Sequence, residues 1–518
     1  MAPERLAGRL APSVLADESA NSLAWRVARC EVWQKRSKAP GCHPPRHFGS
    51  AGFATLFSVT ISPNPQSVRE RFPDDFVFGV ATSSWQIEGS SHNRGESIWD
   101  RFAKVPGAIV DGSTADPACD HVNRLESDLD LIAELGVGAY RFSVSWPRFM
   151  REGTGSISRG ADFYDRLIDG LLERGIEPLL TAYHWDLPQV LQDKGGWLNP
   201  DMAGWFADYC QALASRYGDR VSKVATLNEP WVSAFLGYAT GIHAPGVINA
   251  AQSLEVAYRL MVASGHGIAA LRDAGIASPG IVLNLTTVRV DQPGAENARD
   301  HIHRLQNALF TDLLAGRGVS DEIRQSTEVI TDWSFATPEG DAAAATPIEW
   351  LGVNYYTPIR VGAHNPAGEA QGVGQNTMAY PGCPPATLRP RGPLTTMGWE
   401  VDPSGLRDTL VETAEALPGV DLWVTENGVA YADRVIDGEV YDPDRVSYLA
   451  GHLGASADAL DQGVPLRGYC CWSLMDNLEW AEGRTQTFGI VHVDPVTMER
   501  IPKASYEFFR RVVRGESA

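Results

Sequence analysis

The chain has 518 residues, of which 44% are hydrophobic and 21% charged, so it can bury one large core. Its formal net charge of −20 argues against binding to nucleic acid or to an anionic membrane surface. No apolar run approaches the roughly 18 residues that a membrane-spanning helix needs. The seven cysteines are scattered and form no CxxC pair, which favours reduced thiols in a cytoplasmic protein over a zinc site or a disulfide framework.

The first part of the chain differs in charge from the rest. Residues 1–65 contain eight Lys or Arg and four Asp or Glu, a formal +4, which leaves −24 for the remainder. No apolar segment of the length found in secretory signals occurs there, although the arginines, alanines and serines also suit an organelle transit peptide. We expect residues 1–68 to be a disordered or non-native extension without an assigned function, and residues 69–514 to form a single domain.

From Phe72 onward the same order of elements recurs: an amphipathic helix, a glycine and a short apolar run. The helix predicted over residues 125–135 places Leu125, Leu129, Ile132 and Leu135 on one face. Gly136 ends it, and residues 139–143 follow as a strand. The eight predicted strands are residues 76–82, 139–143, 177–183, 224–228, 280–285, 350–354, 422–426 and 468–473.

Alternating strands and helices predict a parallel sheet, and eight strands predict a single closed (β/α)8 TIM barrel. The structural alternative is an open doubly wound sheet. It is disfavoured because no G-x-G-x-x-G motif follows an early strand and no Walker A motif occurs. In a TIM barrel the active site lies at the C-terminal ends of the strands, so the residues there are the ones that indicate function.

Two glutamates stand at these strand ends, 197 positions apart in sequence: Glu229 follows the fourth strand and Glu426 ends the seventh. In a closed barrel they would face one cavity, where one carboxyl group can protonate a leaving oxygen while the other attacks or positions water, as in glycoside hydrolysis. Pro230 predicts a turn that holds Glu229 out of the strand's hydrogen-bond ladder. The other strand-end residues are Gln86, Arg141, His184, Trp185, Asn228, Asn354, Tyr356 and Trp472.

Each of these residues also has a purely structural interpretation. A strand-end acid is often a salt-bridge partner, His184 alone would more often be an interior histidine, Trp472 could belong to the core, and Arg141 could pin a loop. The functional interpretation is favoured because all of them converge on one rim. No metal site is expected at His301 and His303, because residues two apart do not share a helix face, and no cofactor is expected.

The motifs resemble those of the family 1 glycoside hydrolases, a family of retaining β-glucosidases, from about Phe72 to Tyr506. The matching stretches are "FPDDFVFGVATSSWQIEG" (72–89), "YRFSVSWPR" (140–148), "YHWDLPQ" (183–189), "TLNEP" (226–230), "GVNYYTP" (352–358), "TMGWEVDP" (396–403), "VTENG" (424–428) and "WSLMDNLEWAEG" (472–483). Eight motifs in the right order are a specific signal. The sequence differs from the family pattern at three places. Val122 and Asn123 stand where the family usually has an aromatic residue and His, "TFG" at 487–489 lacks the usual Arg before Phe, and His492 stands where Tyr is common.

The resemblance implies that Glu229 is the general acid/base and Glu426 the nucleophile. Arg141 is expected to keep Glu426 ionised, and the charge of Glu426 to keep Glu229 protonated until Glu426 is glycosylated. It further implies that Asn354 and Tyr356 flank the nucleophile, that Trp472 forms the floor of the sugar site and that Trp399 is a wall for the leaving group. The residues expected to hold the nonreducing sugar are Gln86, His184, Trp185, Asn228, Glu479 and Trp480.

The expected activity is hydrolysis of terminal β-D-glucosyl residues from cello-oligosaccharides and from aryl or alkyl glucosides. A neutral sugar is favoured because Glu479 and Trp480 are intact and no lysine lies in residues 473–502. Transglycosylation with broad galactosyl or fucosyl specificity, a noncatalytic sugar-binding protein and a metal-assisted hydrolase are the alternatives. The partner is a small β-glucoside, with no nucleic acid and no membrane, and homo-oligomerisation is left open.

Overall fold

The computed structural model describes residues 63–364 and 376–517. The extension expected at residues 1–68 therefore lies outside the described residues except for 63–68, where helix α2 (Pro65–Arg69) begins. Within the described residues no helix is long and apolar enough to cross a membrane.

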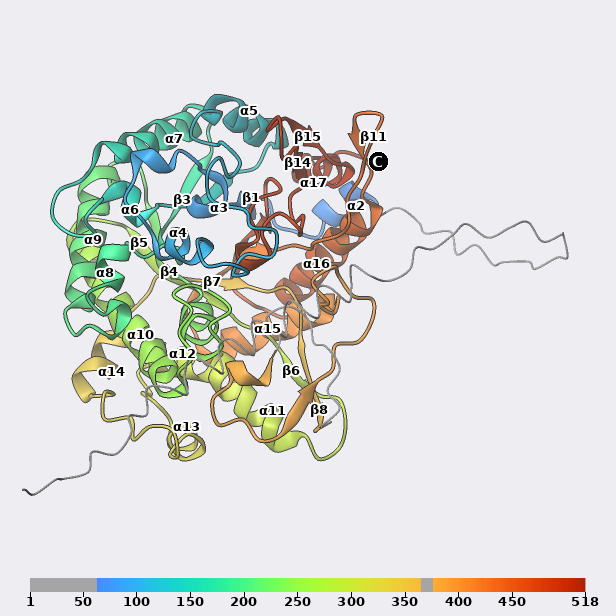
Figure 1. The fold of residues 1–518 in the computed structure, drawn as a ribbon. Coiled ribbons are helices and arrows are strands. Elements are labelled where there is room, and N and C mark those ends of the chain that lie inside the picture. The colour runs from blue at the N-terminus through green and yellow to red at the C-terminus, as the bar shows by residue number, and fades with distance from the viewer. Residues whose placement is uncertain (1–62, 365–375, 518) are drawn as a thin grey trace, which may run out of the picture. The chain divides into compact units, whose positions relative to one another are not determined.

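Eight parallel strands close into a barrel, as predicted (Figure 1). Around the barrel the order is β1-β13-β10-β7-β5-β4-β3-β2, so each strand pairs with its neighbours among the eight along the chain, and β13 closes the ring on β1. The strands are β1 (Val77–Ala81), β2 (Ala139–Ser143), β3 (Glu177–Tyr183), β4 (Lys223–Asn228), β5 (Ser278–Asn284), β7 (Trp350–Asn354), β10 (Asp421–Asn427) and β13 (Leu466–Trp472).

Three of these strands, β2, β3 and β7, have the predicted ends, and the other five differ by one or two residues at one or both ends. The largest differences lie at strand starts. Strand β5 begins at Ser278, although Pro279 follows and has no N–H to donate, and β13 begins at Leu466 rather than at Gly468. Apolar runs locate buried strands well, whereas their ends depend on which neighbour supplies the next hydrogen bond.

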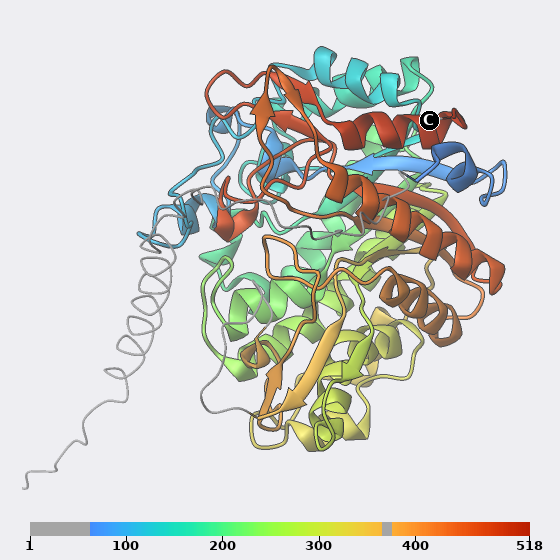
Figure 2. The ribbon, with the colours of Figure 1, turned by 90° about the vertical axis from the view of Figure 1, so that its right-hand side faces the viewer.

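Helices surround the barrel on its outside (Figures 1 and 2). Helix α5 (Leu125–Leu135) has the predicted bounds, and Gly136 ends it with a left-handed φ of 78°, which glycine adopts without strain. The other long helices are α7 (Asp162–Glu173), α9 (Met202–Tyr217), α10 (Ala250–Asp273), α15 (Pro403–Ala416), α16 (Pro443–Asp461) and α17 (Ala504–Arg514).

Shorter elements extend the loops at the strand ends. The short helices are α3 (Ser84–Ile87), α4 (Ile98–Ala103), α6 (Trp146–Phe149), α8 (Gln189–Gln192), α11 (Glu296–His303), α12 (Leu309–Leu314), α13 (Asp321–Ser326) and α14 (Pro338–Ala344). Three small sheets pair β6 (Val288–Val290), β8 (Ile359–Ala363) and β9 (Ala386–Leu388), then β11 (Val435–Ile436) with β12 (Glu439–Val440), and β14 (Val491–Val493) with β15 (Arg500–Pro502).

The barrel interior is a packed core. Trp350 and Trp423 lie inside it with their rings 6.5 Å apart, and glycines on adjacent strands give them space. A Cβ at Gly468 would lie 2.3 Å from the Trp423 ring, and one at Gly280 would lie 2.5 Å from the carbonyl oxygen of Trp350. Large and small residues therefore alternate across the interior, as filling a narrow barrel requires.

The tightest backbone approach at the strand ends is at Gly428, where a Cβ would lie 1.6 Å from the carbonyl oxygen of Trp472. We predict that Gly428→Ala displaces Trp472 and lowers the free energy of unfolding by about 1–3 kcal/mol. Urea denaturation measures this effect. The matched control is Gly454→Ala in α16, where the new Cβ meets nothing within 4 Å and stability should rise by about 0.5–1 kcal/mol. Equal effects at both glycines would contradict the steric explanation.

Candidate active site

The C-terminal ends of the barrel strands bring the predicted residues into one connected group of contacts. Glu229, Glu426, Arg141, Asn228, His184 and Asn354 are all at most 5% exposed. Trp399 comes from the loop that precedes α15, and Glu479 and Trp480 come from the loop after β13. Tyr356, Trp399 and Glu479 retain partial exposure.

Glu426 is held by two donors. The Arg141 guanidinium donates from Nη1 to Glu426 Oε1 at 2.5 Å, and the Tyr356 hydroxyl donates to Glu426 Oε2 at 2.6 Å. Both Arg141 and Glu426 are buried, so their attraction is only weakly screened by solvent. Burial and the charge of Glu426 raise the pKa of Tyr356 well above its ordinary value, so the hydroxyl stays a donor. The carboxylate is therefore stabilised in its ionised form and fixed in orientation.

Glu229 adopts a left-handed backbone, with a φ of 48°. The prediction that Pro230 holds Glu229 out of the strand ladder is wrong for the backbone, because the N–H of Glu229 donates to Val282 O on β5 at 2.9 Å. Pro230 instead opens the helical turn that precedes the π-helix η5 (Val232–Ala239), where its missing N–H costs nothing. The unusual φ turns the side chain away from the strand direction, and Asn354 Nδ2 donates to Glu229 Oε1 at 2.5 Å.

The two glutamates differ in their charge environment. Burial raises the pKa of Glu229 well above its ordinary value, and repulsion from Glu426 raises it further. The hydrogen bond from Asn354 and the charge of Arg141 oppose this rise without cancelling it. The direct ion pair with Arg141 belongs to Glu426 alone. The surroundings therefore favour the protonated form of Glu229 and give Glu426 a cationic partner, which is the asymmetry that an acid and a nucleophile need.

Asn228 connects the two sides of the site. Its Oδ1 accepts from Arg141 Nη2 at 2.7 Å and from Asn354 Nδ2 at 3.1 Å. Its Nδ2 is therefore the donor to His184 Nε2, 3.0 Å away, which leaves the histidine proton on Nδ1. Burial, with a further contribution from Arg141, lowers the pKa of His184 well below its ordinary value. His184 is thus a neutral imidazole whose Nδ1 is buried without a protein partner, so it can donate to a ligand.

Aromatic rings form one wall of the site. The Trp185 and Trp480 rings lie 4.4 Å apart, and the His184 ring lies 5.7 Å from Trp480 and 6.0 Å from Trp472. The indole N–H of Trp185 donates to the carbonyl oxygen of Asn228 at 2.9 Å, which fixes that ring relative to the strand β4 end. Flat apolar faces of this kind suit the C–H faces of a sugar ring.

Gln86 follows β1 and Glu479 follows β13, the two strands whose pairing closes the barrel. Gln86 Nε2 donates to Leu478 O at 2.8 Å and to Asn477 Oδ1 at 3.0 Å, and Glu479 Oε2 lies 3.5 Å away. Burial and the charge of Glu426 raise the pKa of Glu479 to about 8. A side chain with partly free oxygens in this position can bind sugar hydroxyl groups.

Trp399 reaches the site through other aromatic residues. Its ring lies 5.5 Å from Tyr356 and 6.0 Å from Phe488. Tyr356 in turn contacts Glu426, so Trp399 lies beside the residue expected to be the nucleophile and keeps partial exposure, as a wall for a leaving group would.

Sequence reasoning missed several supporting residues. Thr425 Oγ1 donates to Asn354 Oδ1 at 2.7 Å, which directs the Asn354 amide N–H groups toward Glu229 and Asn228. Ser83 Oγ donates to Gln86 Oε1 at 2.5 Å. Asn477 lies inside a quoted motif, and Thr425 directly precedes Glu426, so position alone could have suggested both.

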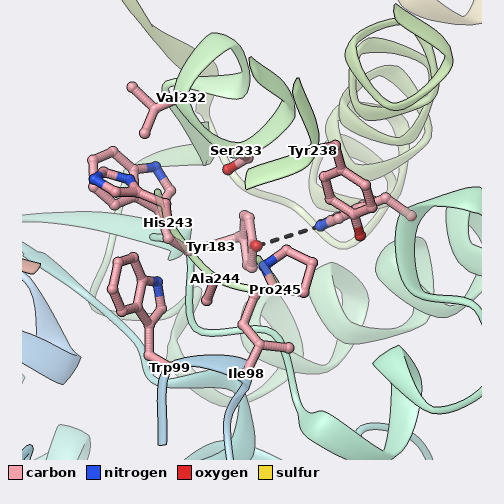
Figure 3. Close-up of a pocket in the computed structure, with 11 residues that line it drawn as sticks. Ile98, Trp99, Tyr183, Val232, Ser233, Tyr238, His243, Ala244 and Pro245 are labelled. Carbon is pink, nitrogen blue, oxygen red and sulfur yellow. Dashed lines mark hydrogen bonds between the residues drawn. The ribbon is translucent and has the colours of Figure 1, made fainter. Parts of the chain in front are cut away.

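A separate pocket lies next to Trp185, and its lining includes neither glutamate (Figure 3). His243, taken as structural from the sequence, lines this pocket with its ring 5.2 Å from Trp99 and 5.6 Å from Trp185. Across the pocket, the Trp197 indole donates to the Tyr183 hydroxyl at 3.3 Å. His243 thus supports the aromatic wall from behind.

The remaining titratable groups do not gather into a metal site in the part of the chain that the structure describes. His301 Nε2 lies 2.9 Å from the Pro381 carbonyl oxygen, and His303 contacts Glu412. The cysteines described are free thiols, and burial raises the pKa of Cys470 and of Cys471 to about 12.

The electrostatic coupling between the glutamates gives a testable prediction. In Glu426→Gln the repulsion is removed, so the pKa of Glu229 should fall toward its ordinary value, although burial continues to raise it. Titration of a ¹³C-labelled Glu229 carboxyl group by NMR measures this shift. The control is Glu126→Gln, a change at an exposed residue on α5, which should leave that titration unaltered. An unchanged Glu229 titration in Glu426→Gln would contradict the coupling.

Comparisons with known proteins agree with this geometry. The glycosyl hydrolase family 1 model matches residues 68–517. Beta-glucosidase A of Thermotoga maritima is 39% identical over 460 residues, covering 86% of this chain and 98% of the relative. Thermostable beta-glucosidase B of Thermobispora bispora is 42% identical over 448 residues, covering 86% of this chain and 90% of the relative.

Solved structures match as well. The Thermotoga maritima β-glucosidase in complex with deoxynojirimycin has a TM-score of 0.79 at 38% identity, covering 86% of this chain and 99% of the other. The psychrophilic β-glucosidase of Micrococcus antarcticus has a TM-score of 0.83 at 37% identity, covering 87% and 99%. The motifs, the closed barrel and these matches together place the chain in glycosyl hydrolase family 1.

Proposed function

We propose that this protein is a retaining β-glucosidase that removes terminal β-D-glucosyl residues from cello-oligosaccharides and from aryl or alkyl glucosides, with residues 69–514 as the catalytic domain. The observation that carries the proposal is the opposite charge environment of two buried glutamates. Glu426 has the ion pair with Arg141, and Glu229 has a raised pKa. Relatives at about 40% identity are called β-glucosidases, which supports the glucoside as substrate.

In the first step Glu229, protonated, gives its proton to the oxygen of the leaving group while the Glu426 carboxylate attacks the anomeric carbon. The two donors on Glu426 orient one oxygen each and leave the carboxylate as a positioned nucleophile. Glu426 then becomes an ester and loses its negative charge. Without that charge the pKa of Glu229 falls, so the same group now accepts a proton from the incoming water.

The remaining residues bind the sugar. The Nδ1–H of His184 and the oxygens of Glu479 are available for hydroxyl groups, and Asn228 binds the hydroxyl next to the reacting carbon. Trp480, Trp185 and Trp472 provide apolar faces, with Trp399 beside the leaving group. The hydrogen bond between Asn228 and the hydroxyl next to the reacting carbon strengthens as positive charge develops on the ring. Asn228 therefore contributes to transition-state binding.

The free thiols among the described cysteines support a cytoplasmic location, and the activity suits a role in the breakdown of cellulose fragments. The same chemistry transfers the glucosyl group to a sugar in place of water when an acceptor outcompetes water. A relative from Bifidobacterium breve is called a bifunctional β-D-glucosidase/β-D-fucosidase, which favours tolerance at the glycone as a second candidate property.

The two-glutamate assignment predicts different behaviour for two variants. Glu426→Ala should lose turnover of an aryl β-glucoside because no nucleophile remains. Glu229→Ala should lose roughly 10²–10⁴-fold in rate, since its acid/base contribution is removed. Added azide should restore Glu229→Ala and yield the β-glucosyl azide, because azide needs no general base. Release of nitrophenol, with identification of the product by NMR, measures both effects.

Glu126→Ala, at an exposed glutamate, is the matched control and should behave as wild type. Turnover by Glu426→Ala equal to wild type would refute the assignment. A wild-type protein that binds glucosides without hydrolysing them would establish the noncatalytic alternative.

The loop after β13 predicts a preference for neutral sugars. Glu479 is a potential anion there, and residues 473–502 contain no lysine to pair with a phosphate. We expect kcat/KM for an aryl β-glucoside 6-phosphate to be at least about 100-fold below that for the neutral glucoside, because the phosphate would meet no lysine and a buried carboxyl group that repels it when ionised. Parallel kinetics on the two substrates decide this. Equal kcat/KM values would show that the 6-position lies away from Glu479.

A further inference from the structure

A buried lysine links two of the loops that form the site. The loop after β10 continues from Glu426, and the loop after β13 contains Glu479 and Trp480. Lys503, directly before α17, lies between these loops, although it is far from both in sequence. Its Nζ donates to Asp433 Oδ2 at 2.5 Å in the first loop and to Asp476 Oδ1 at 2.7 Å in the second. In Figure 1, α17 lies beside β14 and β15 at the edge of the barrel.

Asp476 begins the segment 476–489, which bears Glu479 and Trp480, and its hydrogen bonds hold the two ends of this segment together. Its Oδ1 also accepts the N–H of Gly489 at 2.9 Å, and its own N–H donates to Val491 O at 2.9 Å. The ends of the segment 476–489 are thereby held together at the point where Lys503 contacts them. A Cβ at Gly489 would lie 2.0 Å from the Asp476 nitrogen, so the ends are also in close steric contact. Displacement of Asp476 would move Glu479, which lies three residues further along.

Asp433 is fixed separately. Arg445 on α16 donates from Nη2 to Asp433 Oδ2 at 2.9 Å and also contacts Asp442. The same Nη2 donates to the carbonyl oxygen of Thr487 at 2.7 Å. Arg445 therefore holds the β10 loop in place and touches the far end of the β13 loop, whereas only Lys503 joins the Asp433 and Asp476 carboxylates directly among the residues described.

The network is buried and contains more negative than positive charge. The side chains of Lys503, Asp433 and Asp476 are 0%, 4% and 8% exposed. The carboxylates of Asp433, Asp442 and Asp476 face the basic side chains of Lys503 and Arg445. His492 on β14, the position where the sequence departs from the family pattern, lies 3.0 Å from Asp476 Oδ2 through Nδ1. Burial raises the pKa of Asp476, but Lys503, His492 and Arg445 lower it below its ordinary value overall.

We propose that Lys503 is a positioning residue for glucoside hydrolysis, which holds the loop of Glu479 and Trp480 in register with the loop that follows Glu426. This inference rests on the proposed function, because the effect is on sugar binding and turnover. Lys503 does not touch the reacting atoms. It acts by keeping Asp433 and Asp476 together, which like charges in a buried site would otherwise oppose.

Removal of the ammonium group leaves Asp476 with the His492 imidazole as its remaining side-chain partner among the described residues. We expect Lys503→Met to lower kcat/KM for an aryl β-glucoside by roughly 10- to 100-fold, as displacement of binding groups by about 1 Å does. The pH of maximal kcat/KM should shift downward, because a proton on Asp476 removes the unpaired charge. A role in stability alone would not move the pH profile of the folded enzyme.

Two further variants separate charge from packing. Lys503→Met with Asp476→Asn removes both charges of the pair, so the pH shift should disappear, while kcat/KM should stay at or below that of Asp476→Asn alone because the link between the loops is still missing. Asp476→Asn alone keeps Lys503 paired with Asp433, so it folds without an unpaired buried charge and tests the link even if Lys503→Met does not fold. It should lower kcat/KM without an acid shift. Lys223→Met, which removes the ion pair with Glu177 at the start of β4, is the matched control and should keep the wild-type profile.

The measurements are kcat/KM across pH at a temperature well below unfolding, thermal unfolding, and calorimetric affinity for deoxynojirimycin. Weaker inhibitor binding by Lys503→Met, with an acid shift that disappears in the double variant, supports the proposal. Reduced thermal stability with unchanged kcat/KM, pH profile and inhibitor affinity overturns it. A wild-type protein that does not hydrolyse glucosides would refute the proposed function instead, and inhibitor affinity would still decide whether Lys503 positions the loop.

Discussion

The guanidinium of Arg141 is the group on which the rest of the site depends. It is buried beneath the strand ends and donates to Glu426 and to Asn228. A buried cation needs partners that satisfy it, and a buried carboxylate needs a cation, so each fixes the other. Glu426 is thus paired with a cation inside the barrel, and its charge adds to burial in raising the pKa of Glu229.

From Arg141 the hydrogen bonds extend in both directions. Asn228 orients the His184 ring and fixes its tautomer, while Asn354 donates to both Asn228 and Glu229. Because Asn228 Oδ1 accepts from both Arg141 and Asn354, its amide can face His184 only with the NH2 group, so the network fixes the amide orientation and the histidine tautomer together. The barrel supplies the necessary rigidity, because its interior is filled by buried side chains, among them Trp350 and Trp423, which pack closely against glycines of the adjacent strands.

The loops at the C-terminal ends of the strands contain little regular secondary structure, and ion pairs between side chains hold them in place. Lys503 and Arg445 join the segments that follow β10 and β13, and Arg360 pairs with Glu400 next to Trp399. Ion pairs of this kind contribute little net stability compared with apolar packing, but they fix direction and distance between segments. Trp399, Glu479 and Trp480, which are proposed to contact the leaving group and the sugar, lie on these loops, so the buried charges help to determine where these side chains are.

The sequence by itself determined the barrel, its eight strands and the residues at their ends. Buried parallel strands are short apolar runs that end in polar residues, and this pattern is visible without coordinates, as at Asn228 and Glu229 or at Glu426. Arg141 was also expected near Glu426, because the C-terminal halves of all strands of a closed barrel surround one cavity.

Only the tertiary structure decided how these residues are held. The left-handed backbone of Glu229 and its bond to Val282, the tautomer of His184 and the link through Lys503 all depend on segments far apart in sequence. No local pattern encodes such contacts, because hydrogen bonds and ion pairs are set by distances of a few ångströms between groups that chain folding alone brings together. Sequence indicated which residues meet, and packing fixed their protons, their angles and their supports.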